Sequence, residues 1–261
     1  MRTYILPLLL LTLATPALSS DGVLEINQTC AVETGCFPGD TPGFPVTING
    51  SSGKIFRLTG DLEVLDDDSG GIEVSSENVS IDLNGHTIAG SGFRSGVGIL
   101  NDGADRVTIR GGVIRRFAVG LVILDARLCR VRGIQILRNE IDGLRLIDAH
   151  ENYIGDNHVG SMADATAGIL LQNSHGNTII RNRVVEVGFG RNIRLVDSND
   201  NLIARNRASR SDGPGIELVR SSRNRIRRNL VGSHELSGIS VYDGSDDNEL
   251  SRNRIFGTGG G

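Results

Sequence analysis

The sequence predicts an all-β fold, a single-stranded right-handed parallel β-helix of about eight coils with a small N-terminal cap. Three observations predict this solenoid. Similar residues recur about every 24 positions, hydrophobic residues alternate with a period of two inside each unit, and no longer stretch has helical spacing. The 261 residues include 35 Gly and no Trp, so the predicted core consists of Ile, Leu and Val between many tight turns.

The N-terminal segment is predicted to be a signal peptide that covers residues 1–19. Arg2 precedes an apolar run, Ile5–Leu13, and the small residues Ala17 and Ser19 follow it. The alternative is a membrane anchor, but the run is shorter than the roughly 20 apolar residues that a membrane-spanning helix needs. We therefore expect an exported protein, periplasmic or secreted, with no membrane span once the signal is removed.

Residues 20–70 do not join the repeat and are predicted to cap the solenoid, because an open end would expose its hydrophobic core. Cys30 and Cys36 lie close together in a Gly/Pro-rich part of this segment, and an oxidising compartment favours a disulfide between them. Cys129 has apolar neighbours, which predicts a buried free thiol.

The repeat is predicted to form a β-helix over residues 71–256, followed by a Gly-rich tail at 257–261. Each unit carries one aliphatic residue, usually after a Gly, that aligns with its counterparts in the other units. A leucine-rich repeat has a similar period, but its dominance of Leu is missing, and a left-handed β-helix would show strict hexapeptide spacing. The aligned residues are Ile72, Ile99, Leu121, Leu144, Ile169, Ile193, Ile216 and Ile239.

Later units add a second aliphatic column and two Asn columns. Because strands of successive coils stack about 4.8 Å apart, each column is expected to become a ladder in space. Stacked Asn amides hydrogen-bond one another and the turn backbone, so these Asn are predicted to be structural rather than catalytic. The aliphatic column comprises Ile154, Ile179, Ile203, Ile226 and Leu250; the Asn columns comprise Asn152, Asn177, Asn201, Asn224 and Asn248, and Asn157, Asn182, Asn206, Asn229 and Asn253.

The repeated segments N-x-I-x-x-N-x-[VIA] and G-I-x-L resemble the right-handed β-helix repeats of the pectin-lyase-like superfamily, close in style to those of the periplasmic NosD-type proteins. The resemblance covers Gly71–Ile255, and Asp82–Ile88 (D-L-N-G-H-T-I) is similar to an early coil of many such exported proteins. It implies the fold and leaves the activity open, because the superfamily includes lyases, hydrolases, epimerases and proteins with no known reaction. The D-P-H motif of the alginate epimerases is absent from this sequence.

Arginines flank the second Asn column and are predicted to form two rows along one edge of the solenoid. Arg suits bidentate binding of carboxylate or sulfate, and like charges about 5 Å apart repel unless an anion lies between them. These arginines are therefore candidate binding residues for an anionic polysaccharide; the alternative is a solvated edge with local Arg/Asp pairing. The seven residues are Arg181, Arg183, Arg205, Arg207, Arg228, Arg252 and Arg254.

A histidine pair with nearby acids forms a second candidate site. His150 and His175 occupy equivalent positions in adjacent coils, beside Asp148 and Glu151, and these four are the candidate catalytic residues. An imidazole there could act as a general base oriented by a carboxylate, or bind a metal; polar residues at a turn are the alternative. An acidic column could likewise hold Ca²⁺, share acid/base work, or form Asx turns. It comprises Asp125, Asp148, Asp197 and Asp243, with Asn173 completing the series.

Two classes of function remain. One is an exported β-helix that binds an anionic polysaccharide along its lateral face and, if it is an enzyme, acts as a lyase, hydrolase or epimerase. The other is a non-catalytic exported scaffold or adhesion module with a smooth lateral face. Outward strand positions such as Leu100, Val122 and Leu170 are apolar, which favours the second class, and Arg145 and Glu217 are exceptions. A formal net charge of -4 argues against a globally basic nucleic-acid-binding protein, so no nucleic acid partner is expected.

Overall fold

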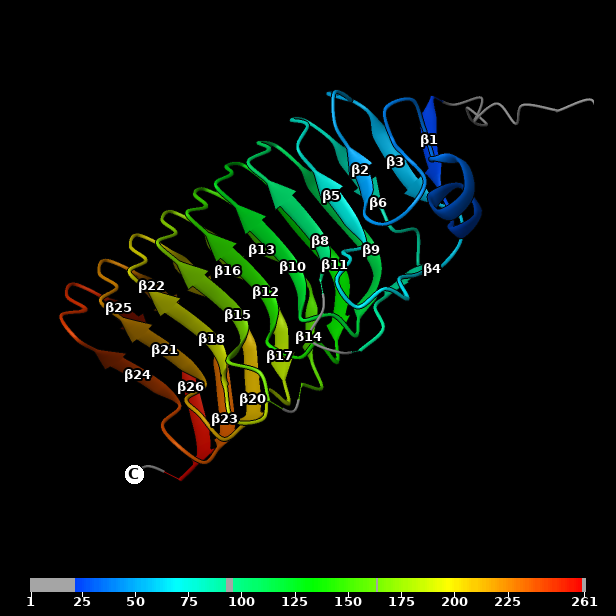
Figure 1. Cartoon of the computed structure of the whole chain (residues 1–261). Coiled ribbons are helices and arrows are strands. Elements are labelled where there is room, and N and C mark those ends of the chain that lie inside the picture. The colour runs from blue at the N-terminus through cyan, green and yellow to red at the C-terminus, as the bar shows by residue number, and fades with distance from the viewer. Residues whose placement is uncertain (1–21, 93–95, 163, 260–261) are drawn as a thin grey trace, which may run out of the picture.

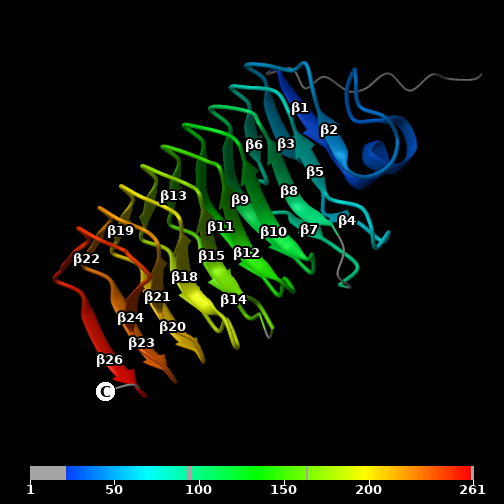
Figure 2. The same cartoon turned by 60° about the vertical axis from the view of Figure 1, so that its left-hand side comes forward.

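The computed structural model describes residues 22–92, 96–162 and 164–259, and these form a parallel β-solenoid. Each coil stacks on the previous one, from the N-terminal end with its short helix to the C-terminal end (Figures 1 and 2). The predicted right-handed parallel β-helix is thereby confirmed. The predicted signal peptide, residues 1–19, lies outside the described residues. Within the described ranges, no helix has both the length and the apolar character needed to cross a bilayer.

The first wall of the solenoid is a nine-stranded parallel sheet. Its register confirms the first aliphatic column, because each predicted residue from Ile72 to Ile239 pairs with its counterpart in the next coil. A fully buried Ile or Leu contributes about 1.5–3 kcal/mol, so this column stabilises the stacking of the coils. The strands are β2 (Val46–Ile48), β5 (Ile72–Val74), β8 (Val97–Asp102), β10 (Val119–Leu124), β12 (Asp142–Ile147), β15 (Ala167–Gln172), β18 (Arg191–Val196), β21 (Ile216–Val219) and β24 (Ile239–Tyr242).

The second and third walls form one seventeen-stranded sheet, because β9 (Thr108–Arg115) and β11 (Arg130–Leu137) run through the corner between them. The second aliphatic column lies in register on the second wall, as predicted. The second wall also contains β1 (Val23–Ile26), β3 (Ile55–Leu58), β6 (Ser80–Asp82), β13 (Tyr153–Gly155), β16 (Thr178–Ile180), β19 (Leu202–Ala204), β22 (Arg225–Arg227) and β25 (Glu249–Ser251). The third contains β4 (Leu62–Glu63), β7 (Thr87–Ala89), β14 (His158–Gly160), β17 (Arg183–Val185), β20 (Arg207–Ser211), β23 (Leu230–His234) and β26 (Arg254–Thr258).

The β-helix begins before the predicted boundary at residue 71. β2, β3 and β4 pair in register with β5, β6 and β7, so they form a coil of the solenoid rather than part of a cap. The repeat pattern did not reveal this coil because its strands are short and lack the G-I-x-L segment. The cap is therefore smaller than predicted and lies between β1 and β2.

The N-terminal cap contains the helix η1 (Cys30–Thr34) and lies over the end of the core (Figure 1). The predicted disulfide between Cys30 and Cys36 is present. Phe37 is buried in the cap and packs edge-on against Phe56 of the first coil, with ring centroids 4.9 Å apart. These aromatic rings cover the aliphatic core at this end, as a solenoid requires.

Among the described residues, the coil formed by β24, β25 and β26 is the last one. Val241, Leu250 and Ile255 belong to core columns, but they are 40–48% exposed in this last coil. β26 ends at Thr258, two residues beyond the predicted end of the β-helix, and residues 260–261 of the predicted tail lie outside the described residues.

Buried Asn ladders hold the corners on either side of the second wall. The backbone N–H of Asn201 donates to Oδ1 of Asn224 (2.8 Å), and its side-chain amide donates to the carbonyl of Ser174 (3.0 Å). Its own Oδ1 accepts the N–H of Asn177 (2.8 Å). The second Asn column repeats this pattern. The predicted structural role of both columns is confirmed, since each amide satisfies backbone groups of its neighbours.

Candidate functional site

The two predicted histidines come together where the first wall turns into the second. The rings of His150 and His175 are stacked, with centroids 5.1 Å apart and planes inclined by 6°. Nδ1 of His150 accepts the backbone N–H of His175 (3.1 Å), and Nδ1 of His175 accepts the N–H of Asn199 (3.0 Å). Both rings therefore bond to the backbone of the following coil.

This bonding fixes the tautomer of both rings. A neutral imidazole that accepts a hydrogen bond at Nδ1 carries its proton at Nε2. Burial lowers the pKa of His150, and so does the neighbouring His175, which favours the neutral ring. Both Nε2 atoms are then donors, so the pair cannot accept a proton or bind a metal without losing an Nδ1 bond. The predicted general-base role does not fit this geometry, whereas each Nε2–H can donate a hydrogen bond.

Other side chains at the same turn position bond to the backbone in the same way. Oδ1 of Asp105 accepts the N–H of Arg127 (2.7 Å), Oδ1 of Asn199 accepts the N–H of Ser222 (2.7 Å), and Oγ of Ser222 accepts the N–H of Asp246 (3.0 Å). The histidine pair is thus part of a longer column of turn residues. This column favours the alternative interpretation, in which the histidines are polar residues of a turn.

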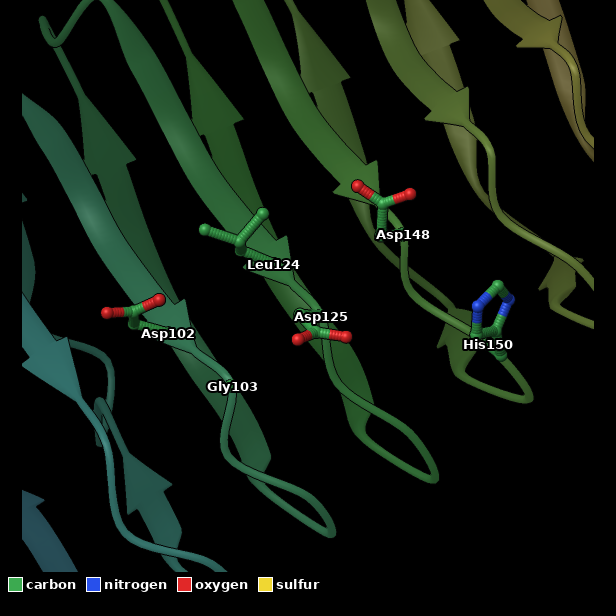
Figure 3. Close-up of a pocket in the computed structure, with 6 residues that line it drawn as sticks. All are labelled: Asp102, Gly103, Leu124, Asp125, Asp148 and His150. Carbon is green, nitrogen blue, oxygen red and sulfur yellow. The ribbon is translucent and has the colours of Figure 1, made fainter.

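The two predicted acids lie near the histidines on separate turn positions. Figure 3 shows Asp102, Asp125 and Asp148 at the ends of successive strands of the first wall, with His150 further along the turn. These four help to line an open depression of about 560 Å³. Glu151 and both histidines line a second depression of about 340 Å³. The structure therefore groups all four candidate catalytic residues, and we call them the histidine corner.

The acidic column that contains Asp148 is interrupted by arginine. Its predicted members have φ of 46–51°, in the left-handed region where Asp and Asn are favoured, which supports the turn interpretation. Arg220 lies between Asp197 and Asp243 in this column and binds Asp197 through two hydrogen bonds of 2.7 and 2.8 Å. The sequence pattern did not reveal Arg220 because its side chain differs in type from the acids and the amide of this column. Among the described residues, no three His, Cys, Asp or Glu side chains are grouped to hold a metal ion, so Ca²⁺ binding stays a prediction.

The predicted arginine rows lie at the next corner, between the second and third walls. One row occupies the same turn in four successive coils, and its members have φ of 55–57°. Gly111 and Gly133 occupy this turn in earlier coils. The left-handed region costs a residue other than Gly roughly 1–2 kcal/mol, so the turn itself does not favour arginine. We call the seven predicted arginines the arginine edge; the row at the turn comprises Arg181, Arg205, Arg228 and Arg252.

Most of the arginine edge is unpaired. Arg181 is the exception, because it binds Asp156 through two bonds of 2.6 and 2.8 Å and also contacts the hydroxyl of Tyr153. Among the described residues, the side chains of Arg205, Arg228 and Arg252 form no ion pair or hydrogen bond. Unpaired arginines at successive turns make this edge a cationic strip.

The second arginine row is shorter than predicted. Arg183 pairs with Arg207 in the register of the third wall, but Leu230 separates Arg207 from Arg254. Two arginines outside the predicted set, Arg225 and Arg227, lie on β22 beside the edge and are exposed. Their adjacency to Arg228 in the sequence was the signal that could have found them.

The histidine corner and the arginine edge are not brought together. The short strands of the second wall separate them, and three extended residues span about 10 Å. The predicted catalytic and binding residues therefore form two sites on different corners.

Solved structures share this fold at low sequence identity. An alginate lyase from Paenibacillus sp. str. FPU-7 is 10% identical with a TM-score of 0.64, over 90% of this chain and 97% of the lyase. A DFA-IIIase from Arthrobacter chlorophenolicus A6 is 16% identical with a TM-score of 0.65, over 89% of this chain and 65% of that one. At such identities the similarity shows the fold alone.

The periplasmic alginate epimerase AlgG is 17% identical with a TM-score of 0.62. The match covers 77% of this chain, which spans only 50% of the epimerase. A comparison with curated proteins finds no match. These comparisons leave the activity of this chain open.

A family model described as "Periplasmic copper-binding protein (NosD)" matches residues 76–259. Protein copper sites use His, Cys and Met ligands. Here Cys129 is a buried free thiol, as predicted, and burial raises its pKa to about 11. Met162 is buried in the core, and the histidine pair uses Nδ1 for the backbone. The described side chains therefore do not fit a copper centre.

The matched region begins after β5 and ends one residue beyond β26. It contains every Asn ladder, the histidine corner and the arginine edge, and it covers well over half of the chain. On this match the chain belongs to the NosD family of β-helix proteins.

Proposed function

We propose that this protein is exported and binds an anionic polysaccharide along the arginine edge. The observation that carries the proposal is the run of unpaired arginines at one turn of successive coils, Arg205, Arg228 and Arg252. Two like charges about 4.8 Å apart in water repel by about 1 kcal/mol, and an anion between them removes the repulsion. A polysaccharide with carboxylate or sulfate groups supplies such anions along a straight line.

The structural neighbours support this class of ligand. Two of them are named as an alginate lyase and an alginate epimerase, and alginate is an acidic polysaccharide. Arginine suits such a ligand because its guanidinium binds carboxylate and sulfate through two parallel hydrogen bonds. A lysine row would provide the charge without this geometry, but the chain contains almost no lysine.

The test compares two triple variants that remove the same number of positive charges. Arg205, Arg228 and Arg252 are replaced by Ala in the edge variant. Arg106, Arg220 and Arg223, which pair with acids, are replaced by Ala in the control variant. We expect the edge variant to elute from immobilised heparin and polygalacturonate at clearly lower salt, and the control variant to elute close to the wild type. Equal elution of the two variants would contradict specific binding at the edge.

The histidine corner favours binding without catalysis. Both Nδ1 atoms accept hydrogen bonds from the backbone, so neither ring is free to act as a base. Processing of the polysaccharide stays a prediction; in this tautomer Nε2 of His150 or His175 would donate a hydrogen bond to a substrate oxygen and would transfer no proton. Incubation with polygalacturonate and alginate tests it through unsaturated products and new reducing ends. Products formed by the wild type and lost on His150→Ala would support catalysis at this corner.

A further inference from the structure

The outer face of the first wall carries a group of charged residues among apolar ones. One outward column runs in register through Leu100, Val122, Arg145, Leu170 and Arg194. Apolar residues dominate its early coils, whereas β12, β18 and β21 place charges close together. We call these charged residues the face cluster; it comprises Asp142, Arg145, Arg191, Arg194 and Glu217.

Two carboxylates of the face cluster are buried and anchor its arginines. The side chain of Asp142 is fully buried, accepts hydrogen bonds from the hydroxyl of Thr166 (2.7 Å) and the N–H of Ala167 (2.6 Å), and pairs with Nε of Arg145. The side chain of Glu217 is 5% exposed. Its two oxygens lie 3.0 Å from Nε of Arg191 and 2.7 Å from Nε of Arg194.

The anchoring leaves the ends of the guanidinium groups free. All three arginines contact their carboxylates through Nε, and their terminal nitrogens form no hydrogen bond with the described residues. Their side chains are 26–32% exposed. Burying a carboxylate is costly, and an apolar residue such as Leu170 satisfies the same sheet position in a neighbouring coil. The fold of the wall does not require acids at these positions. We therefore assign the buried acids the role of holding the arginines in place.

The spacing of the arginines defines what they can bind. Only Leu170 separates Arg145 from Arg194 in the column, so the two lie two coils apart, about 9.6 Å. Val122 continues the apolar surface on one side. Phe189, which is 72% exposed, precedes Arg191 at the edge of the wall. Along the axis of the solenoid, the positively charged side chains of Arg145 and Arg194 thus lie on either side of the apolar side chain of Leu170.

We propose that the face cluster is a second anion-binding site, which takes a short oligosaccharide of uronic acid residues. Carboxylates on alternate sugars bind the free guanidinium ends of Arg145 and Arg194, and the sugar between them rests on Leu170. The site lies on the first wall, away from the arginine edge between the second and third walls. This proposal does not depend on binding at the arginine edge. The arginines of the face cluster are held by buried acids, whereas most of those at the edge have no partner among the described residues.

Titration calorimetry of the full chain with trigalacturonate at low salt tests the site. The double variant Arg145→Lys with Arg194→Lys keeps both positive charges but loses the paired N–H donors of the guanidinium groups. We therefore expect at least tenfold weaker binding of trigalacturonate. Arg220→Lys with Arg223→Lys is the matched control and is expected to bind as the wild type does. No binding by the wild type at millimolar trisaccharide, or equal affinity of the double variant, would overturn the proposal.

Glu217→Gln separates positioning from net charge. The change makes the protein more positive, so attraction by net charge alone predicts tighter binding of trigalacturonate. Loss of the anchor for Arg191 and Arg194 predicts weaker binding, by several fold, and this is the result we expect. Circular dichroism and the melting temperature establish that the variant is folded; the lysine variant keeps the proposal testable if it is not.

Two further measurements identify the ligand and the site. The edge variant that lacks Arg205, Arg228 and Arg252 is expected to retain the affinity for trigalacturonate. If it loses that affinity while the lysine variant keeps it, the trisaccharide binds at the edge and the face cluster is not a site.

Triglutamate is the peptide probe of similar charge, and affinity for it equal to that for trigalacturonate would assign the cluster to acidic peptides and overturn the saccharide proposal.

Discussion

The histidine corner and the arginine edge both repeat polar residues at each coil, but their side chains have different partners. At the corner, His150 and His175 bond through Nδ1 to the backbone of the following coil. At the edge, Arg205, Arg228 and Arg252 have no partner among the described residues. Repetition of a polar residue is therefore poor evidence for function in a solenoid. The informative observation is whether the side chain already forms a hydrogen bond with the next coil.

The largest expected effect is the loss of a ladder residue. Replacing Asn201 with Leu removes its amide bond to Ser174 and leaves the backbone N–H of Asn177 buried without an acceptor. We expect the free energy of unfolding to fall by about 2–4 kcal/mol, measured by urea denaturation. Arg205→Ala is the matched surface control and should change it by less than about 0.5 kcal/mol. An unchanged stability of the Asn201 variant would refute the ladder.

A pH effect is expected from the buried imidazole of His234. Nδ1 of this ring lies 2.9 Å from the hydroxyl of Ser211, and Nε2 lies 3.2 Å from the carbonyl of Ala208. Burial lowers its pKa in the folded protein, so below about pH 6.5 the unfolded chain binds more protons. The free energy of unfolding should then decrease as the pH falls below that value. His234→Gln should reduce this dependence, and an identical pH profile for the two proteins would contradict it.

A smaller effect sharpens the interpretation of the histidine corner. If the role of His150 is to accept a backbone hydrogen bond at the turn, another acceptor should be able to take its place. Asn199 is such an acceptor at the equivalent position of another coil. His150→Asn should keep stability close to that of the wild type, whereas His150→Ala should lose about 1 kcal/mol. Thermal and urea unfolding measure both. Equal loss in the two variants would show that the imidazole itself is needed.

The smallest expected effect concerns salt. Repulsion along the unpaired arginines is screened by salt, so the melting temperature of the wild type should rise slightly between low and physiological ionic strength. The edge variant without Arg205, Arg228 and Arg252 should show less of this rise. A rise of the same size in both proteins would mean that the edge arginines do not repel one another measurably.

The sequence predicted the columns well, because a residue repeated at each coil must stack on its counterpart. The first aliphatic column and both Asn ladders occur in the predicted register. The first coil was missed since β2 and β4 are short and carry no signature. Arg220 was missed because it differs in type from the acids of its column.

The chemistry of the sites was less predictable. Whether His150 is a base or a donor depends on what its Nδ1 contacts, and that partner comes from the next coil. The face cluster depends on pairing between β18 and β21, which places Glu217 beside two arginines. Arg145 and Glu217 stood out in the sequence as charged exceptions, but they do not pair with each other.

The most direct test of the central claim is the salt dependence of polysaccharide binding by the edge variant and its paired-arginine control. Each bound anion releases counterions, so the logarithm of the binding constant falls with the logarithm of salt concentration in proportion to the contacts made. The account predicts a shallower slope for the variant lacking Arg205, Arg228 and Arg252 on polygalacturonate, and an unchanged slope for the variant lacking Arg106, Arg220 and Arg223. Identical slopes for the two variants would contradict it.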